Sequence, residues 1–201
     1  YRTIPDIDAY LTSANQAWAT ERRIINGRPL KVFINQHASL RDFFEVSMAA
    51  GGDKEYIIDQ GVDGKLKRTT YNKASLEVDR IANLLRSYGC VKGDRIAIIS
   101  RNTREWITTF WAIACIGGIA SAVNAFSTPE VLAFCLTLTT SKVVVIDQER
   151  AFMLAPFVDR LHAAGCSQIL VVNGKGATKG MKDFAEELRN GALIIFLDTA
   201  S

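Results

Sequence analysis

Residues 70–124 constrain the fold of this 201-residue chain more than any other stretch. They hold, in order, an amphipathic run, a Gly-Asp turn, a short apolar run, a polar turn, a long apolar run that ends at two glycines, and another short apolar run. This order is typical of a helix–strand–helix–strand unit. Because similar alternation continues toward the C-terminus, the sequence predicts an α/β fold with a largely parallel sheet flanked by helices.

Apolar spacing defines the first helix of this unit. Steps of four, three and four residues place one buried stripe at Ala74, Val78, Ile81 and Leu85. Gly89 is suited to end the helix in a left-handed conformation. Residues 95–100 are too short for a helix and almost continuously apolar, which favours a parallel strand covered on both faces.

The second helix has a polar start and an uncharged body. Asn102-Thr103-Arg104-Glu105 resembles a capping box with Asn102 or Thr103 as the cap, and the strand that follows is expected over residues 119–123. Residues 106–129 include no charged residue and have about the length of a membrane span. Their glycine pair and polar residues favour a buried helix followed by a buried strand, with membrane insertion as the alternative.

The other elements follow from the same signals. Residues 22–35 are basic and mixed, with Asn26-Gly27 as a turn signal, and Ser39 with Asp42 forms a capping box before a helix that stops at Gly51. Further helices are expected over residues 7–19, from 128 onward, and over 152–164 and 183–190. Further strands are expected over residues 56–59, 66–70, 142–147, 168–173 and 193–197.

Cysteines and histidines offer no reactive or metal-binding arrangement in the sequence. They stand far apart, at Cys90, Cys115, Cys135, Cys166, His37 and His162. There is no C-x-x-C, no neighbouring histidine pair, and no nucleophile paired with a base at readable spacing. The spacing argues against a zinc site and a disulfide scaffold, and reduced cytoplasmic thiols are expected.

Two stretches resemble anion-binding sites. Residues 174–180, GKGATKG, follow a predicted strand and have the glycines and lysines that a phosphate-binding loop needs. Their spacing fits neither G-x-x-x-x-G-K-[ST] nor G-x-G-x-x-G, so a solvated connection is the preferred interpretation. Residues 100–102 precede a helix N-terminus, but helix capping explains Asn102 and Glu105. We therefore assign no catalytic, cofactor-binding or metal-binding residue.

The formal charge of +3 is too small to indicate a nucleic-acid-binding protein. One local basic cluster, in which the charges are expected to be solvated, comprises Arg22, Arg23, Arg28 and Lys31.

Several motifs in order resemble the N-terminal region of adenylate-forming (AMP-binding) enzymes, the superfamily of acyl- and aryl-CoA synthetases, luciferases and peptide-synthetase adenylation domains. They are Thr70-Tyr71, Gly93-Asp94-Arg95-Ile96-Ala97-Ile98, Arg101-Asn102-Thr103-Arg104-Glu105-Trp106, residues 119–124 ending in Asn124, Thr128-Pro129-Glu130-Val131-Leu132, and residues 183–188. The likeness covers about residues 39–190. Ala74 and Ser75 depart from a frequent leucine, and residues 121–123 lack the usual proline.

The resemblance implies an extension over residues 1–36 and an incomplete N-terminal α/β subdomain over residues 37–201. The family's phosphate loop, ribose-binding aspartate and catalytic lysine are expected beyond Ser201, so none of its catalytic positions carries over, and Asn102 and Asn124 are interpreted as structural. For the complete enzyme the family implies ATP, Mg²⁺, coenzyme A and a small-molecule carboxylate, as in fatty acid metabolism. The expected partners are the remainder of the same enzyme and, by self-association, a second copy.

Two other interpretations remain open at this point. One is a naturally short, non-catalytic binding or interaction module that retains the lobe. The other is peripheral membrane contact through residues 106–129.

Overall fold

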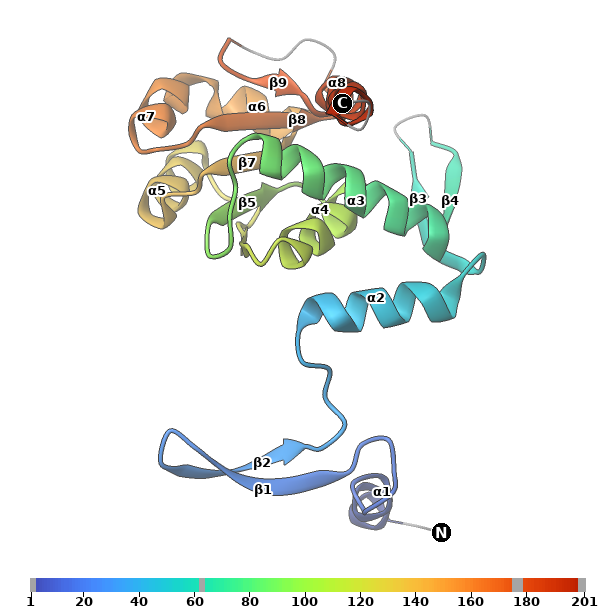
Figure 1. Cartoon of the computed structure of the whole chain (residues 1–201). Coiled ribbons are helices and arrows are strands. Elements are labelled where there is room, and N and C mark those ends of the chain that lie inside the picture. Colours follow the sequence, from blue (N-terminus) through green and yellow to red (C-terminus); the bar gives the residue numbers. More distant parts are fainter. Residues whose placement is uncertain (1–2, 62–63, 175–178, 199–201) are drawn as a thin grey trace. The chain divides into compact units, whose positions relative to one another are not determined.

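The computed structural model describes residues 3–61, 64–174 and 179–198, with side chains through residue 191. The chain divides into two compact units, Tyr1–Phe43 and Phe44–Ser201, which are described separately (Figure 1). The predicted family boundary after residue 36 stays a prediction.

The first unit consists of one helix and a β-hairpin. Helix α1 spans Ile4–Leu11, and strands β1 (Thr20–Ile25) and β2 (Arg28–Phe33) pair antiparallel. Asn26 and Gly27 both have positive φ, 51° and 75°, as a two-residue hairpin turn requires. The sequence signalled this turn but not the strands on either side of it.

The predicted helix over residues 7–19 is wrong in its second half. Thr12 caps α1, and its hydroxyl donates to the carbonyl of Asp8 at 2.8 Å. Asn15 has a φ of 69°, which a right-handed helix cannot accommodate. The apolar spacing alone did not reveal this break.

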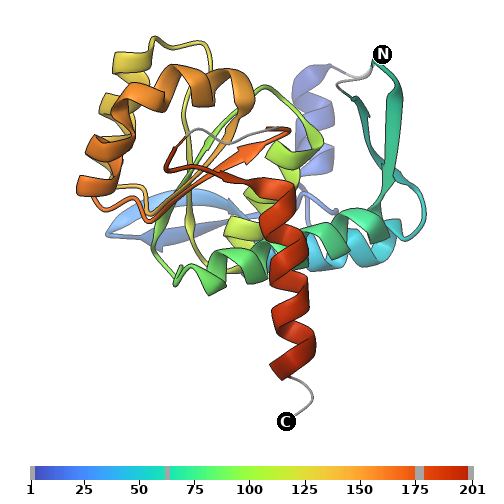
Figure 2. The ribbon, with the colours of Figure 1, turned by 90° about the horizontal axis from the view of Figure 1, so that it is seen from above.

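Five parallel strands form the sheet of the second unit, in the order β6-β5-β7-β8-β9 (Figure 2). Their bounds are β5 Arg95–Ile99, β6 Ile119–Ala122, β7 Val143–Asp147, β8 Gln168–Val172 and β9 Lys182–Asp183. Numbered by their order in the chain, these strands run 2-1-3-4-5, a doubly wound arrangement. The predicted parallel α/β sheet is confirmed.

Helices cover both faces of this sheet. On one face lie α3 (Tyr71–Ser87), α4 (Arg104–Cys115) and the beginning of α8 (Phe184–Asp198). On the other lie α5 (Pro129–Thr139), α6 (Gln148–Leu154) and α7 (Val158–Ala163). Side chains alternate between these two cores along β5, with Ile96 and Ile98 in the first and Ala97 and Ile99 in the second. This alternation explains the near-continuous apolar sequence.

The predicted stripe of α3 is confirmed. Its four residues are completely buried: Ala74, Val78, Ile81 and Leu85. Thr70 caps the helix by accepting from the amide of Lys73 at 3.3 Å, and Gly89 just beyond it has a φ of +75°.

Helix α2 (Leu40–Gly51) leads from the first unit into the second, and a hairpin follows it. Ser39 Oγ accepts from the amide of Asp42 at 3.1 Å, as the predicted capping box requires. The hairpin strands are β3 (Glu55–Gln60) and β4 (Leu66–Thr70); Val62 and Asp63 of the predicted turn lie outside the described residues. Tyr56 of β3 accepts a 2.9 Å hydrogen bond from Trp111 of α4.

The uncharged stretch folds as a helix and an edge strand. Thr108 and Thr109 are completely buried, but Ile119 of β6 is 50% exposed because β6 is the first strand of the sheet. The expectation of a buried strand is therefore wrong. No helix within the described residues is long and apolar enough to cross a membrane.

Two further predictions fail toward the C-terminus. The helix over residues 152–164 is divided into α6, a 3₁₀ turn (Ala155–Phe157) that contains Pro156, and α7, because proline cannot continue the hydrogen-bonding of a helix interior. The strand over residues 193–197 is instead part of α8. The helix predicted over residues 183–190 therefore continues past Gly191, which does not have the positive φ that Gly89 has.

Candidate functional site

The carboxyl ends of β5 and β7 form the candidate site. These strands are neighbours, but the connections leaving them turn to opposite faces of the sheet. Such a switch point is where open α/β sheets bind ligands. In this chain the segment after β5 contains Ser100, Arg101 and Asn102, and β7 ends at Asp147.

Asp147 holds the two strand ends together. One carboxylate oxygen accepts from the backbone amide of Arg150 at 3.0 Å and caps α6. The other accepts from the backbone amide of Arg101 at 3.2 Å. A single side chain therefore positions the start of a helix and the loop after the neighbouring strand.

Arg150 extends this connection to the segment after β6. Its side chain is only 5% exposed. Nε donates to the carbonyl of Ala125 at 2.8 Å, and Nη1 lies 2.7 Å from Glu149 and 3.3 Å from Asp147. The guanidinium also lies over the ring of Phe126, 5.6 Å from its centroid. The sequence analysis did not identify Arg150 as a residue of this site. The available signal was an arginine in the first helical turn after a buried strand.

Thr103, rather than Asn102, caps α4. Its hydroxyl accepts from the amide of Trp106 at 3.3 Å. The third helical residue is therefore Trp106, so the predicted capping box is incomplete. Glu105 instead pairs with Arg104 at 2.8 Å.

Asn124 organises the segment after β6. Its side-chain oxygen accepts from the amide of Phe126 at 3.0 Å, which is a local turn contact and agrees with a structural role. A pocket of about 430 Å³ lies beside it, lined by Ser100, Arg101, Asn102, Trp106 and residues 122–126. These residues could form one wall of a ligand site, but they include no nucleophile paired with a base.

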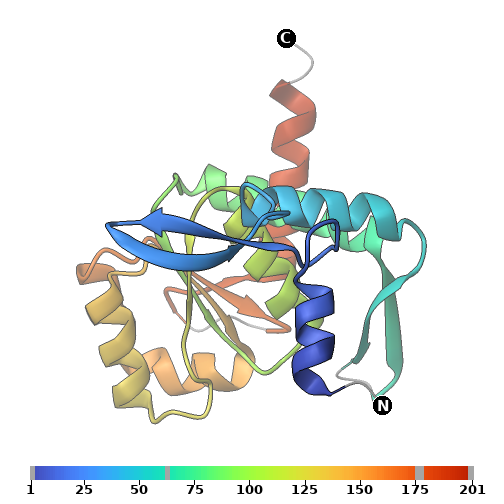
Figure 3. The same cartoon turned by 90° about the horizontal axis from the view of Figure 1, so that it is seen from below.

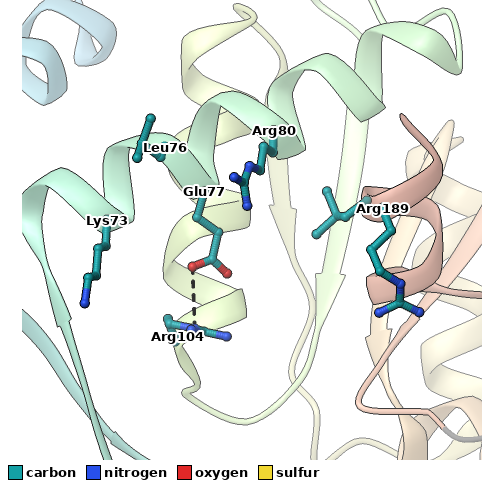
Figure 4. Close-up of a pocket in the computed structure, with 7 residues that line it drawn as sticks. Lys73, Leu76, Glu77, Arg80, Arg104 and Arg189 are labelled. Atoms are coloured by element: carbon teal, nitrogen blue, oxygen red, sulfur yellow. Dashed lines mark ion pairs between the residues drawn. The ribbon is translucent and has the colours of Figure 1, made fainter. Parts of the chain in front are cut away.

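A second pocket, of about 620 Å³, lies between α3 and α8 (Figure 4). It is lined by Lys73, Leu76, Glu77, Arg80, Arg104, Leu188 and Arg189. Figure 4 shows the cationic groups spread along the pocket rather than directed at one point. Lys73 and Arg80 are seven residues apart, roughly 10 Å along α3.

Carboxylates offset the positive charge at the centre of this pocket. Glu77 lies 3.6 Å from Nε of Arg104. Burial raises the pKa of Glu77 despite this guanidinium. Burial also acts to raise the pKa of Glu105, but hydrogen bonding, chiefly from Arg104, outweighs it and the pKa is lowered. We interpret the pocket as a half-buried ion-pair cluster rather than an anion site.

The two histidines lie in different units. The His37 ring packs edge-on against Phe43, 5.4 Å between centroids. In His162, Nδ1 lies 2.7 Å from the carbonyl oxygen of Cys166 and Nε2 lies 3.3 Å from that of Gly180. Neither contact pairs a histidine with a nucleophile, and the described residues contain no group of three potential metal ligands.

The other sequence candidates are not brought together. Residues 175–178 of the glycine-rich stretch lie outside the described residues. All four cysteines are free thiols. Burial raises the pKa of Cys166 to about 11 and raises that of Cys90, so both thiols stay protonated and unreactive near neutral pH.

The model of the AMP-binding enzyme family matches residues 44–192. The chain belongs to this family. Residue 44 is also the first residue of the second compact unit, so the match covers the sheet and its helices and leaves out the first unit.

Acyl-CoA ligases are among the similar proteins. A long-chain-fatty-acid–CoA ligase of Thermus thermophilus is 26% identical over 156 residues, which are 77% of this chain and 28% of that protein. Long-chain-fatty-acid–CoA ligase FadD13 of Mycobacterium tuberculosis is 32% identical over 126 residues, 62% of this chain and 23% of that protein. The chain thus spans about a quarter of these curated relatives.

Solved structures share the fold. A putative long-chain-fatty-acid CoA ligase from Rhodopseudomonas palustris has a TM-score of 0.62 and 27% identity, over 74% of this chain and 36% of that chain. The anthranilate CoA ligase AuaEII, in complex with anthranoyl-AMP, has a TM-score of 0.64 and 21% identity, over 77% of this chain and 28% of that one. The fold matches the N-terminal domains of acyl-CoA ligases, as the motifs predicted.

Proposed function

We propose that this chain is the N-terminal portion of an ATP-dependent acyl-CoA synthetase. In the complete enzyme, a carboxylate oxygen attacks the α-phosphate of ATP, forming an acyl-adenylate and releasing pyrophosphate. The sulfur of coenzyme A then attacks the acyl carbon, forming a thioester and releasing AMP. The family match over residues 44–192, which covers the whole parallel sheet, is the observation that supports this proposal.

The described residues supply a scaffold in this proposal. Asp147 and Arg150 fix the loops at the carboxyl ends of three strands, so those loops present a preformed surface to the rest of the enzyme. Mg²⁺ would offset phosphate charge when bound. The family resemblance implies that the metal and nucleotide contacts come from other parts of the complete enzyme.

The remaining assignments are part of the same proposal. The partners are the remainder of the enzyme and a small-molecule carboxylate, and the setting is the cytoplasm, in keeping with four free thiols. A fatty acid is the preferred substrate class, because long-chain-fatty-acid–CoA ligases are among the relatives.

Carboxylate-dependent exchange of labelled pyrophosphate into ATP tests the proposal. We expect no exchange by the 201-residue chain and clear exchange by the product of the complete reading frame when fatty acids are supplied. Exchange by the 201-residue chain alone would contradict the scaffold role. The synthetase assignment would be contradicted if the longer product showed no pyrophosphate exchange with any member of a panel of acyl and aryl carboxylates.

A non-catalytic interaction module is the second candidate. It is favoured because the charged side chains at the carboxyl ends of the strands, Asp147 and Arg150, both form hydrogen bonds that hold loops in place. A reading frame that stops directly after Ser201 would support this candidate and oppose the first.

A further inference from the structure

The two edges of the parallel sheet differ in how they are protected. At one edge, β9 is two residues long and charged: Lys182 lies 3.4 Å from Glu187, and Asp183 accepts from the amide of Glu186 at 2.7 Å. Short, charged edges discourage another strand from pairing. At the other edge, β6 has four uncharged residues in unbroken register with β5, within the uncharged residues 106–129. β6 therefore has no charge, proline or bulge to protect it.

One side of β6 presents backbone groups that no strand pairs. The amides of Ile119 and Val123 donate to carbonyl oxygens immediately before β5 and within it, at 2.8 Å and 3.1 Å. Because successive residues of a strand direct their backbone groups to opposite sides, Ala120 and Ala122 face away from β5. Among the strands of the described residues, only β5 pairs with β6. The N–H and C=O groups of the two alanines are therefore the groups that an added strand would bind.

The described part of the second unit does not continue the sheet beside β6. Helix α8 follows β9 directly, at the opposite edge, and projects from the unit (Figure 3). The side chains of β6 suit the approach of a strand, because three of its four residues are alanine or serine. The fourth, Ile119, is 50% exposed and offers an apolar contact.

The size of this edge favours a strand of the same polypeptide over a second copy. Four residues extend roughly 13 Å, and a contact of that length falls well short of the roughly 1,000 Å² that separate molecules need for a specific interface. Within one polypeptide the effective concentration of a strand is on the order of millimolar, so a short contact is sufficient. The matched relatives are long enough to supply one, since this chain spans 28% of the Thermus thermophilus ligase.

We propose that an uncharged β-strand from the remainder of the longer enzyme pairs with the open side of β6 and adds a sixth strand to the five described. The added strand binds the backbone groups of Ala120 and Ala122. It is uncharged because a charged side chain would find no partner along β6. This inference rests on the proposed function, which requires a polypeptide longer than the 201 residues of this chain.

Hydrogen exchange of single amides tests the proposal, measured by mass spectrometry with electron-transfer fragmentation. The two proteins compared are the 201-residue chain and the product of the complete reading frame. We expect the amides of Ala120 and Ala122 to exchange at least about a hundredfold more slowly in the longer product, because the added strand accepts hydrogen bonds from them. The amides of Ile119 and Val123 are internal controls, since they face β5 and should be slow in both proteins.

Three results would overturn the added strand. Equally fast exchange of both alanine amides in the two proteins would mean that nothing pairs with this side. Slow exchange in the 201-residue chain at every concentration would mean that the chain covers this side itself. Slow exchange that appears only as this chain is concentrated from about 1 to about 100 µM would mean that a second copy pairs with β6. Pyrophosphate exchange is a separate readout, so the synthetase assignment can fail while the alanine amides stay protected.

Two proline substitutions test which side of β6 carries the contact. Ala122→Pro removes a donor from the open side and should leave the urea midpoint of the 201-residue chain nearly unchanged, because proline is tolerated where the N–H of an edge strand faces solvent. In the longer product it should make the Ala120 amide exchange at least about tenfold faster. Val123→Pro, the matched control, removes the donor to Ile98 and should lower the midpoint of both proteins. An Ala120 amide that stays slow in the longer Ala122→Pro product would contradict the proposal.

Discussion

The two compact units achieve order by different means. In the second, β5, β7 and β8 carry side chains into a core on each face of the sheet. In the first, Ala19 is the only buried residue among the described residues 3–43. The hairpin of that unit depends on backbone pairing and on exposed ring contacts such as Trp18 with Phe33, 5.8 Å between centroids.

The difference indicates where the stability of the chain resides. About forty residues without a core lie near the lower limit for independent folding, whereas the second unit encloses its sheet on both faces. The family match begins at the same residue as the second unit. We therefore expect the family fold to be the cooperative unit and the first unit to contribute little to its stability.

The largest expected effect separates the two units directly. Ile98→Ala removes a completely buried side chain from β5, an inner strand of the sheet, and should lower the free energy of unfolding by about 2–5 kcal/mol. Trp18→Ala, at a residue 60% exposed in the first unit, should change it by less than about 0.5 kcal/mol. Urea titration monitored by far-UV circular dichroism measures both. Equal losses would refute the comparison.

The next largest loss of stability is expected at the carboxyl ends of the strands of the second unit. Arg150→Met leaves the carbonyl of Ala125 without its donor and Asp147 without a buried cation, and should cost about 2–3 kcal/mol. Arg101→Met, at a side chain 62% exposed, should cost less than about 1 kcal/mol. The same titration distinguishes them, and a neutral Arg150→Met would remove the proposed role of this contact.

A smaller effect tests which residue begins α4. Thr103→Ala should cost about 1 kcal/mol, because it removes the acceptor for the amide of Trp106. Asn102→Ala should be close to neutral. If thermal unfolding showed a larger loss of stability for Asn102→Ala than for Thr103→Ala, Asn102 would be the cap, which the sequence motif also allowed.

The smallest effect appears in acid. The Lys142 ammonium, 2.8 Å away, lowers the pKa of Asp94, and the amide of Val91 lowers it further. The stabilisation is therefore present above the ordinary aspartate pKa of about 4 and is lost as the pH falls through the lower folded-state value. Urea midpoints measured from pH 7 down to pH 2 should fall less steeply in Asp94→Asn. An unchanged slope would mean that this pair does not stabilise the second unit.

The sequence predicted the structure correctly where the spacing of apolar residues alone determines which side chains are buried. The stripe of α3 and the apolar run of β5 each allow a single packing arrangement, so spacing was sufficient. It failed where a backbone break or a distant neighbour decides the outcome. Asn15 ends a pattern that could have continued as a helix, and β6 is half exposed because it stands at the edge of the sheet.

The carboxyl edge was only partly predictable. Loops after parallel strands are expected to meet there, and Asn124 was assigned a structural role from its motif. The contact from Arg150 to Ala125 joins segments 25 residues apart, and no local pattern encodes it. For the same reason the ion pair of Glu77 with Arg104, between two different helices, was not anticipated.

Native-state hydrogen exchange tests the comparison most directly. We expect the amides of β5, β7 and β8 to exchange only through global unfolding, and those of β1 and β2 to exchange at least about a hundredfold faster through local opening. Hairpin amides as slow as those of β7 would contradict the account, because they would show that the first unit belongs to the same cooperative structure as the sheet.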